Sequence, residues 1–255
     1  IIFNPLDGGV DFGEIINRSN KNLNIKDLQI GNYYAGVPDN FKTITKEYFF
    51  MAPQEILMLC NSKSKLLQYH PNTEPSKVLE LESMPAYNND QGTSVILLDS
   101  VMIDEFSYSE ELHFELLAEV KGVSLERINT EIPTSQNSNW HSASEASYFA
   151  TPTQINSQVQ TSLITKNVMT LSPKLFSPNN DGNDDFLIIQ LQFPTSGYSG
   201  RITIFDSKGR EVKSLLNNTL LGTINTYYWD GINENGNKAA IGRYIIYVKA
   251  THSNK

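Results

Sequence analysis

Cysteine is nearly absent from this chain, and long apolar runs are absent altogether. The only cysteine, Cys60, lies within the apolar run at 56–60, so an intrachain disulfide is excluded and we expect a small buried side chain. No stretch approaches the roughly 18 apolar residues that a membrane-spanning helix requires. The sequence therefore predicts no membrane span. It begins at Ile1 without a methionine or a signal peptide, which is expected of a mature chain or an excised fragment.

Basic residues are also scarce, with 20 Lys and Arg against 28 Asp and Glu and a formal net charge of −8. A nucleic-acid-binding protein needs a basic face to neutralise phosphates, so the composition argues against that class. The charge is uneven, because residues 1–157 carry 10 basic and 21 acidic side chains, whereas residues 158–255 carry 10 and 7. This asymmetry predicts two separate domains.

Sequence motifs of catalysis are missing as well. There is no Gly-x-Ser-x-Gly elbow, phosphate loop, His-Glu-x-x-His or Rossmann fingerprint. One acidic cluster offers paired carboxylates of the kind that hydrolyse glycosides, namely Asp104, Glu105, Glu110, Glu111, Glu115 and Glu119. No aromatic stretch accompanies it to form a sugar cleft, and charge runs usually form solvated faces. We therefore expect a protein that is not an enzyme and has no catalytic residues.

Short strand-like segments separated by turn residues dominate the chain. Turn signals at a spacing of roughly 8–12 residues are typical of a β-sandwich. The clearer expected strands are 11–17, 55–60, 94–99, 186–193, 200–206, 226–229 and 243–250. The glycine-punctuated loop at 230–236 predicts a long hairpin connection between the last two.

One segment argues locally for a helix. Ser109 is placed to cap residues 110–120, where leucines recur at helical spacing, and Gly122 is placed to end the helix. The surrounding pattern favours strands, so helix and extended chain both stay open here.

Residues 150–168 are polar, uncharged until Lys166 and weakly patterned, as in a linker. We therefore predict a first domain at 1–157, a linker at 158–167 and a second domain at 168–255.

The run Ser-Pro-Asn-Asn-Asp-Gly-Asn-Asp-Asp at 177–185 places oxygen-bearing side chains at every second position. The candidate metal ligands are Asn179, Asp181, Asn183 and Asp185. Calcium loops use this spacing to direct several hard oxygens at one cation. Calcium is therefore the candidate cofactor, and no other cofactor is expected.

The same run departs from an EF-hand loop begun at Asn179. The sixth position is Asp184 in place of glycine, and the twelfth is Gln190 in place of the bidentate glutamate. An EF-hand is excluded, and a cation would need further ligands, for example from the Asp230 loop. Asn, Asp and Gly also build tight turns by hydrogen bonding their own backbone. A cation site and a purely structural turn both remain open.

Two tryptophans and a histidine are the remaining candidates. Trp229 and Trp140 could stack on sugars, but we expect both to anchor a core. His141 lacks a partner His or Cys at metal spacing, so we expect a structural role for it.

The first 157 residues carry three motifs in order. Phe-Gly-Glu-Ile-Ile-Asn-Arg-Ser at 12–19 and Pro-Gln-Glu-Ile-Leu-Met-Leu at 53–59 resemble the opening and middle strands of bacterial lamin-tail domains. Lys-Gly-Val-Ser-Leu-Glu-Arg-Ile at 121–128, followed by 138–143 and 150–152, is similar to the closing half of that family. Gly13 stands where the family more often has an aliphatic residue. The resemblance implies an immunoglobulin-like β-sandwich.

The remainder of the chain resembles the immunoglobulin-like domain of the flagellar hook-capping protein, and the similar gliding-motility-associated C-terminal domains of Bacteroidetes. The matching segments are 176–184, 204–212, 228–231, 235–236 and 242–245. Some relatives act as sorting signals for secretion. The fold class predicted for the whole chain is therefore all-β, with two tandem immunoglobulin-like β-sandwich domains.

The function that these resemblances imply is a secreted or cell-surface module for adhesion, anchoring or spacing. Its partner would be a protein or a glycan at the cell surface. Two alternatives stay open, an accessory C-terminal region of a larger secreted nuclease or glycan hydrolase, and a carbohydrate-binding module.

Overall fold

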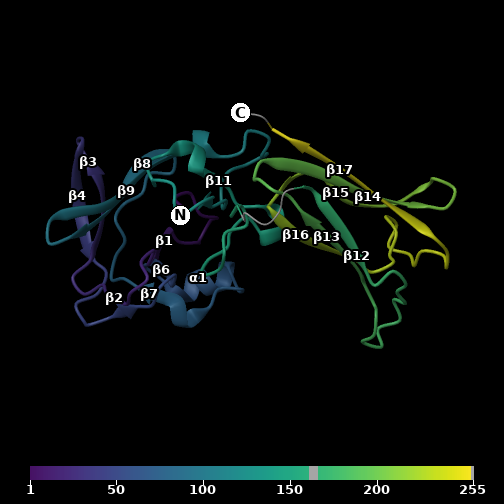
Figure 1. Ribbon diagram of the computed structural model, residues 1–255, viewed down its shortest axis with the longest axis horizontal. Helices are drawn as coiled ribbons and strands as arrows, with labels where there is room; N and C mark the ends of the chain where they lie inside the picture. The colour runs from purple at the N-terminus through teal and green to yellow at the C-terminus, as the bar shows by residue number, and fades with distance from the viewer. Residues whose placement is uncertain (161–165, 254–255) are drawn as a thin grey trace. The chain divides into compact units, whose positions relative to one another are not determined.

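The structure is a computed structural model that describes residues 1–160 and 166–253 (Figure 1). The chain divides into two compact units, the first made of Ile1–Ala143 and Tyr148–Asn156, the second of Ser144–Ser147 and Ser157–Lys255. The domain boundaries expected from the sequence stay predictions. Residues 161–165 of the expected linker lie outside the described residues.

The first unit is built of short strands with one α-helix and three 3₁₀ turns among its described residues. Its elements are β1 (Phe12–Ile16), β2 (Leu23–Asn24), β3 (Gln29–Tyr34), β4 (Val37–Thr43), β5 (Phe50–Met51), β6 (Ile56–Cys60), α1 (Lys63–Tyr69), η1 (Pro75–Lys77), β7 (Val78–Glu80), β8 (Gln91–Leu98), β9 (Val101–Ser109), η2 (Glu110–Leu112), β10 (Leu125–Arg127), η3 (Asn137–Asn139) and β11 (Trp140–Ser142). Its larger sheets have the strand orders β1-β6-β7 and β4-β3-β8-β9.

Strand β6 is the centre of the first unit because both of its faces are buried. Leu57 and Leu59 belong to one apolar cluster, while Met58 and Cys60 belong to another. A continuous apolar run is the pattern expected of a strand that is covered on both faces. The expectation that Cys60 is a small buried side chain is confirmed, and its burial raises the pKa of the thiol.

The helices differ from the sequence expectations at two places. Helix α1 was not expected; it lies in the crossover between β6 and β7, and these strands pair in parallel and therefore need such a connection. The only helical element in residues 110–120 is the single 3₁₀ turn η2, although the Ser109 hydroxyl does accept a hydrogen bond from the backbone of Glu111. The N–H of Phe114 bonds the Ser142 hydroxyl at 2.9 Å, so it does not continue a helix.

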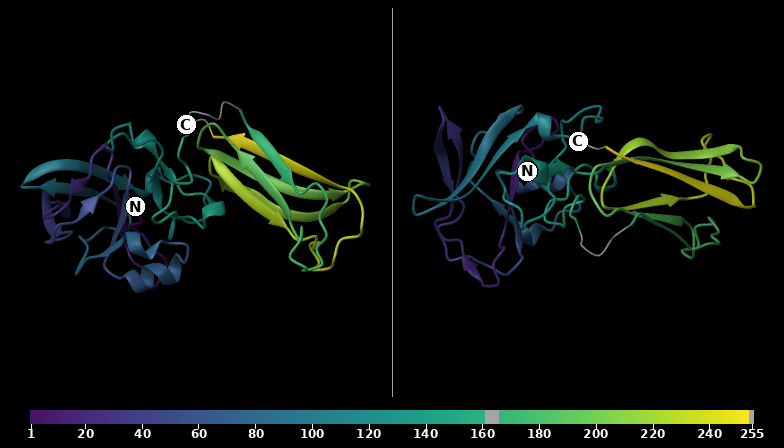
Figure 2. Two further views of the ribbon diagram at one scale, coloured as in Figure 1. Left: turned by 60° about the horizontal axis from the view of Figure 1, so that its bottom comes forward. Right: turned by 45° about the horizontal axis from the view of Figure 1, so that its top comes forward.

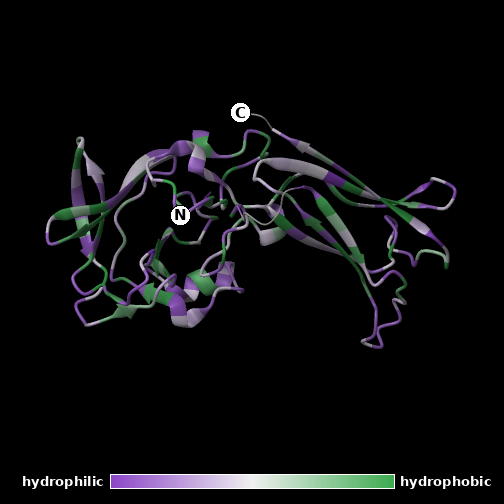
Figure 3. Cartoon of the chain, in the orientation of Figure 1, coloured by the Kyte–Doolittle hydropathy of each residue, from purple (hydrophilic) through white to green (hydrophobic). Residues whose placement is uncertain are grey.

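The second unit contains two three-stranded antiparallel sheets. Its elements are η4 (Glu145–Ser147), β12 (Val168–Ser172), β13 (Leu187–Gln192), β14 (Tyr198–Asp206), β15 (Glu211–Leu221), β16 (Ile224–Trp229) and β17 (Tyr244–His252). The strand orders are β12-β13-β16 and β15-β14-β17, and Figure 2 shows the sheets as two layers. Between them lies one apolar cluster that includes Ile189, Ile202, Ile204 and Trp229. Figure 3 shows the tip of the loop that follows β12 as hydrophilic.

The prediction of a hairpin around residues 230–236 was wrong. β16 pairs with β13 and β17 pairs with β14, so this loop carries the chain from one sheet to the other. Strand pairing partners are chosen by the whole sandwich, and a glycine-rich loop alone does not select them.

The fold class predicted from the sequence is confirmed, since the chain is all-β with tandem immunoglobulin-like β-sandwiches. Among the described residues, the one α-helix is far too short to cross a lipid bilayer, as expected from the absence of long apolar runs.

Candidate functional site

The Asx-rich run at 177–185 folds around the carboxylate of Asp185. Its Oδ1 accepts hydrogen bonds from the backbone N–H of Asn179 at 3.1 Å and of Asn180 at 2.6 Å. Its Oδ2 accepts one from the backbone N–H of Gly182 at 2.8 Å. Backbone amides of the loop thus surround the Asp185 carboxylate.

Asp181 has a similar role earlier in the run. Its Oδ1 accepts from the backbone N–H of Asn183, and its Oδ2 accepts from the side-chain amide of Asn179, both at 2.8 Å. The Asn179 side-chain oxygen accepts in turn from the backbone N–H of Asp181 at 3.2 Å. These bonds, first of all the one from the Asn179 side chain, lower the pKa of Asp181. Such Asx turns are how Asn and Asp build tight loops.

The structure therefore brings three predicted metal-ligand side chains together, those of Asn179, Asp181 and Asp185. Asn183 takes part through its backbone N–H, and its side chain also bonds Asp181, so all four predicted ligand residues meet in this loop. Within the residues that the structure describes, no group of three or more His, Cys, Asp or Glu side chains is arranged to hold a metal ion. The calcium hypothesis stays a prediction, because that statement concerns imidazole, thiol and carboxylate ligands and does not cover side-chain amide oxygens.

The loop between β16 and β17 lies against this run, but it contributes a positively charged side chain there and no carboxylate. The Lys238 ammonium donates to the backbone oxygen of Pro178 at 3.0 Å. Asp230, considered above as a source of a further calcium ligand, accepts the backbone N–H of Ile232 at 2.9 Å. Its carboxylate closes its own turn.

The same loop is tied to β15 by Glu234. One carboxylate oxygen accepts the backbone N–H of Ser214 at 2.7 Å, and this bond above all lowers the pKa of Glu234. Asn233 closes the loop by accepting the backbone N–H groups of Asn235 and Asn237, both at 3.0 Å. In this loop, too, the polar side chains accept hydrogen bonds from backbone N–H groups.

Trp229 anchors the core of the second unit, as expected. It is 1% exposed, and its indole N–H donates to the backbone oxygen of Ile232 at 3.0 Å. The rings of Phe176 and Tyr244 lie 5.4 Å and 4.9 Å from its own. A buried ring cannot stack on a sugar.

Trp140 in the first unit is also held by the fold. Its ring stacks on Phe106 at 3.6 Å, and its indole N–H donates to the backbone oxygen of Thr134 at 2.8 Å. His141 packs against the ring of Phe114 at 5.7 Å, in keeping with the structural role expected for it.

A second histidine, not singled out from the sequence, is buried beside it. The Nδ1 atom of His113 lies 2.8 Å from the hydroxyl of Ser142, and burial lowers the pKa of His113 to about 4. Since the Ser142 oxygen accepts the N–H of Phe114, its proton is available to a neutral His113 ring.

The residues of the acidic cluster are exposed to solvent. All six side chains, Asp104, Glu105, Glu110, Glu111, Glu115 and Glu119, belong to exposed residues. Glu105 accepts the Tyr33 hydroxyl at 3.0 Å, and Asp104 accepts the Thr134 hydroxyl at 2.7 Å. The solvent exposure expected from the charge run is confirmed.

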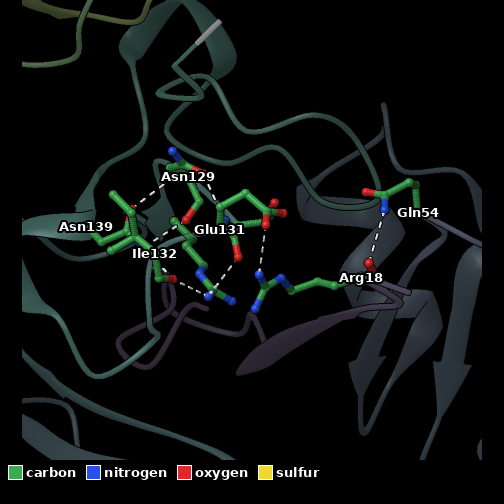
Figure 4. A network of polar contacts seen from close by, with 8 residues as sticks. Arg18, Gln54, Asn129, Glu131, Ile132 and Asn139 are labelled. Atoms are coloured by element: carbon green, nitrogen blue, oxygen red, sulfur yellow. Dashed lines mark hydrogen bonds and ion pairs between the residues drawn. The ribbon is translucent and has the colours of Figure 1, made fainter. Parts of the chain in front are cut away.

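A polar network closes the segment between β10 and β11 (Figure 4). The Asn139 side chain makes two bonds to the backbone of Asn129, its Oδ1 accepting the N–H and its Nδ2 donating to the carbonyl oxygen, both at 2.9 Å. The Arg127 guanidinium donates to the backbone oxygens of Thr130 and Ile132. This network fixes a loop that carries little regular structure of its own.

The edge of this network is an ion pair at the surface. Arg18 and Glu131 approach to 3.4 Å, and Gln54 donates to the backbone oxygen of Arg18 at 3.5 Å (Figure 4). Exposed pairs of this kind contribute about 0–1 kcal/mol, so the pair adds little to stability.

Two carboxylates in the first unit, the half-buried Glu14 and the buried Glu126, were not singled out from the sequence. Glu14 on β1 accepts the backbone N–H of Thr153 at 2.6 Å, and Glu126 on β10 accepts the hydroxyl of Thr151. Burial raises the pKa of Glu14 to about 7. Both acids fasten the segment 151–153 to strands. The sequence did contain a sign of this position. Glu14 follows Phe12 by two residues, and alternate residues of a strand point to the same face, so Glu14 lies on the face of an apolar residue.

Comparison with known proteins supports one of the two resemblances. Residues 180–254 match the family model described as the FlgD Ig-like domain. The match begins inside the Asx-rich run and covers β13 through β17. No curated protein matches the chain. The lamin-tail resemblance of the first unit stays a prediction.

Proposed function

We propose that this protein is a non-catalytic structural and binding module of the cell surface or the secreted fraction. The observation that carries this proposal is the use made of its polar side chains. The carboxylates of Asp185, Glu234 and Glu14 each accept backbone N–H groups, so they serve to hold loops.

Enzymes arrange such groups differently. A catalytic acid or base must reach a substrate, and it stands in a cleft with a nucleophile or a second titratable group at a set distance. All six residues of the acidic cluster are exposed, and Glu105 and Asp104 bond side chains of their own unit. Rigid sandwiches with solvated faces suit spacing, anchoring and adhesion.

The FlgD Ig-like match at 180–254 supports the module character of the second unit. The resemblances to lamin-tail and gliding-motility-associated domains support a place at the surface of a Bacteroidetes-like bacterium. The partner class proposed is a protein or a glycan at that surface.

The alternative of an accessory region in a larger secreted enzyme rests on the same resemblances. The carbohydrate-binding alternative has less support, because Trp229 is buried and Trp140 is stacked on Phe106. The gene context around this chain separates the first alternative from the proposal.

The test has two arms. Antibodies raised against the chain should label intact source cells, and brief protease treatment of intact cells should remove the label. The purified chain, coated on beads, should bind protein or glycan arrays while turning over no ester, glycoside or phosphodiester substrate. Labelling only after lysis would contradict the location, and turnover abolished by a single carboxylate-to-amide change would contradict the non-catalytic role.

A further inference from the structure

The outer face of the sheet β15-β14-β17 places two cations side by side. Arg201 on β14 and Lys249 on β17 are direct partners in the antiparallel register, so their side chains stand on the same face. Like charges in directly opposed positions destabilise a sheet. Among the residues that the structure describes, neither side chain forms an ion pair.

Arg201 is held in place on this face. Its Nε donates to the side-chain oxygen of Asn217 on β15 at 2.8 Å. That bond leaves the two terminal nitrogens of the guanidinium, which are the atoms that grip a carboxylate in a two-pronged fashion.

Apolar side chains continue the face toward the other end of β17. Ile245 is 56% exposed and Tyr247 is 49% exposed, and the Tyr247 ring meets Phe205 of β14 edge-on at 6.4 Å. Thr203, the register partner of Tyr247, is only 4% exposed. A basic and aromatic surface thus runs along β14 and β17, and the positions of these two strands on this face carry no carboxylate; the nearest one in the register is Glu211 of β15, opposite Phe205.

β17 is also the edge of its sheet. Of the described strands, it pairs with β14 alone, so one side of its nine-residue backbone faces away from the sheet. An open edge offers N–H and C=O groups to an incoming strand. Two copies of β17 side by side would bring the Arg201 and Lys249 charges of both copies into one sheet, so pairing of the protein with itself is disfavoured.

We propose that β17 binds an extended, acidic segment of a partner protein by strand addition, with Lys249 and Arg201 selecting its carboxylates. The proposal rests on the binding function argued above and names the partner chemistry. Backbone pairing supplies affinity, Ile245 and Tyr247 supply apolar contacts, and the opposed cations supply specificity.

The test uses the full chain and a displayed library of random ten-residue peptides. Selection should enrich peptides rich in Asp and Glu, and the enriched peptides should slow amide hydrogen exchange in β17. Reversing one charge with Lys249→Glu should weaken the best peptide by about tenfold or more. The matched control is Lys208→Glu, an exposed change in the β14–β15 turn, and it should leave affinity unchanged.

Two further measurements guard against misfolding and against side-chain recognition alone. A peptide in which Lys replaces every acid should bind Lys249→Glu better than it binds the native chain, which an unfolded variant cannot do. N-methylation of alternate peptide amides should abolish binding, because it removes main-chain donors. Enrichment of neutral or basic peptides, protection of other strands, or binding indifferent to N-methylation would overturn the proposal. If the chain keeps its array ligands but enriches no peptide on β17, this inference fails while the proposed function stands.

Discussion

Gly231 lies so close to Pro178 that a β-carbon on the glycine would stand 2.8 Å from the proline Cγ. The two residues come from the two Asx-rich loops of the second unit, and Gly231 has a φ of +72°. Close approach and left-handed backbone together leave room for glycine alone.

We therefore expect Gly231→Ala to lower the free energy of unfolding of the second unit by about 2–4 kcal/mol. Urea denaturation followed by circular dichroism measures this loss. Gly236→Ala is the matched control, because Gly236 has a φ of +76° but no atom within 4 Å of the added carbon. The control should lose about 1–2 kcal/mol, from backbone strain alone. Equal losses in the two variants would show that contact with Pro178 does not matter.

Asp185→Asn should also destabilise the second unit, by about 1–3 kcal/mol, because an amide can replace only part of a carboxylate that accepts three backbone N–H groups. Asp184→Asn removes the same charge from the neighbouring residue, and Asn tolerates its φ of 49°. Thermal unfolding of the two variants side by side measures the difference. A larger loss for Asp184→Asn would contradict the role given to Asp185.

The two hypotheses for the Asx-rich run predict different calorimetric results with calcium. Because the oxygens of Asp181 and Asp185 accept N–H groups of their own loop, we expect no saturable heat and no change in unfolding temperature. Saturable binding that disappears in Asp181→Asn would instead establish the cation site at 179–185.

The stability of the first unit should depend on Glu14 and pH. Burial raises the pKa of Glu14 from 4.5 to about 7, so the folded state holds a proton that the unfolded state has released. The stabilisation is therefore complete below pH 4.5 and is lost as the pH rises through about 7.

Relative to Glu14→Gln, the native chain should lose on the order of 2–3 kcal/mol across that window. Urea unfolding of both proteins at pH values on either side of the window measures the difference. Glu82→Gln, the same change at an exposed position, should give a difference that is flat with pH. A flat difference for Glu14→Gln as well would show that this carboxylate is ionised throughout.

Trp229→Phe should cost about 1–3 kcal/mol of stability, since it removes a partly buried hydrogen bond to Ile232 and some of the ring packing. Its binding to a glycan array should match that of the native chain wherever the protein is folded. Selective loss of glycan binding in a fully folded Trp229→Phe protein would revive the carbohydrate-binding alternative.

Local patterns predicted the strands, while their partners depended on distant residues. The apolar run at β6 and the indole of Trp229 were assigned correctly, because burial follows from apolar character wherever a strand lands. The 110–120 segment had a cap and helical spacing, yet the N–H of Phe114 bonds Ser142, which lies 28 residues away. The sequence of the segment itself gives no indication of that bond.

The candidate site shows the same division. The Asx pattern at 177–185 correctly marked a loop of converging oxygens, but spacing alone does not say whether N–H groups or a cation fill them. Glu14 was missed because a carboxylate in an apolar strand gains its raised pKa only from the residues that fold over it.

Because both faces of β6 are buried, a side chain on this strand can report on the opening of the first unit. The thiol of Cys60 is the only one in the sequence, and it is sealed on a strand shared by two apolar clusters. A thiol reagent can reach it only when those clusters part, so the labelling rate reads the opening free energy of the first unit without a signal from the second. Substitutions in the first unit can thus be ranked by the time that the single thiol of each variant takes to react.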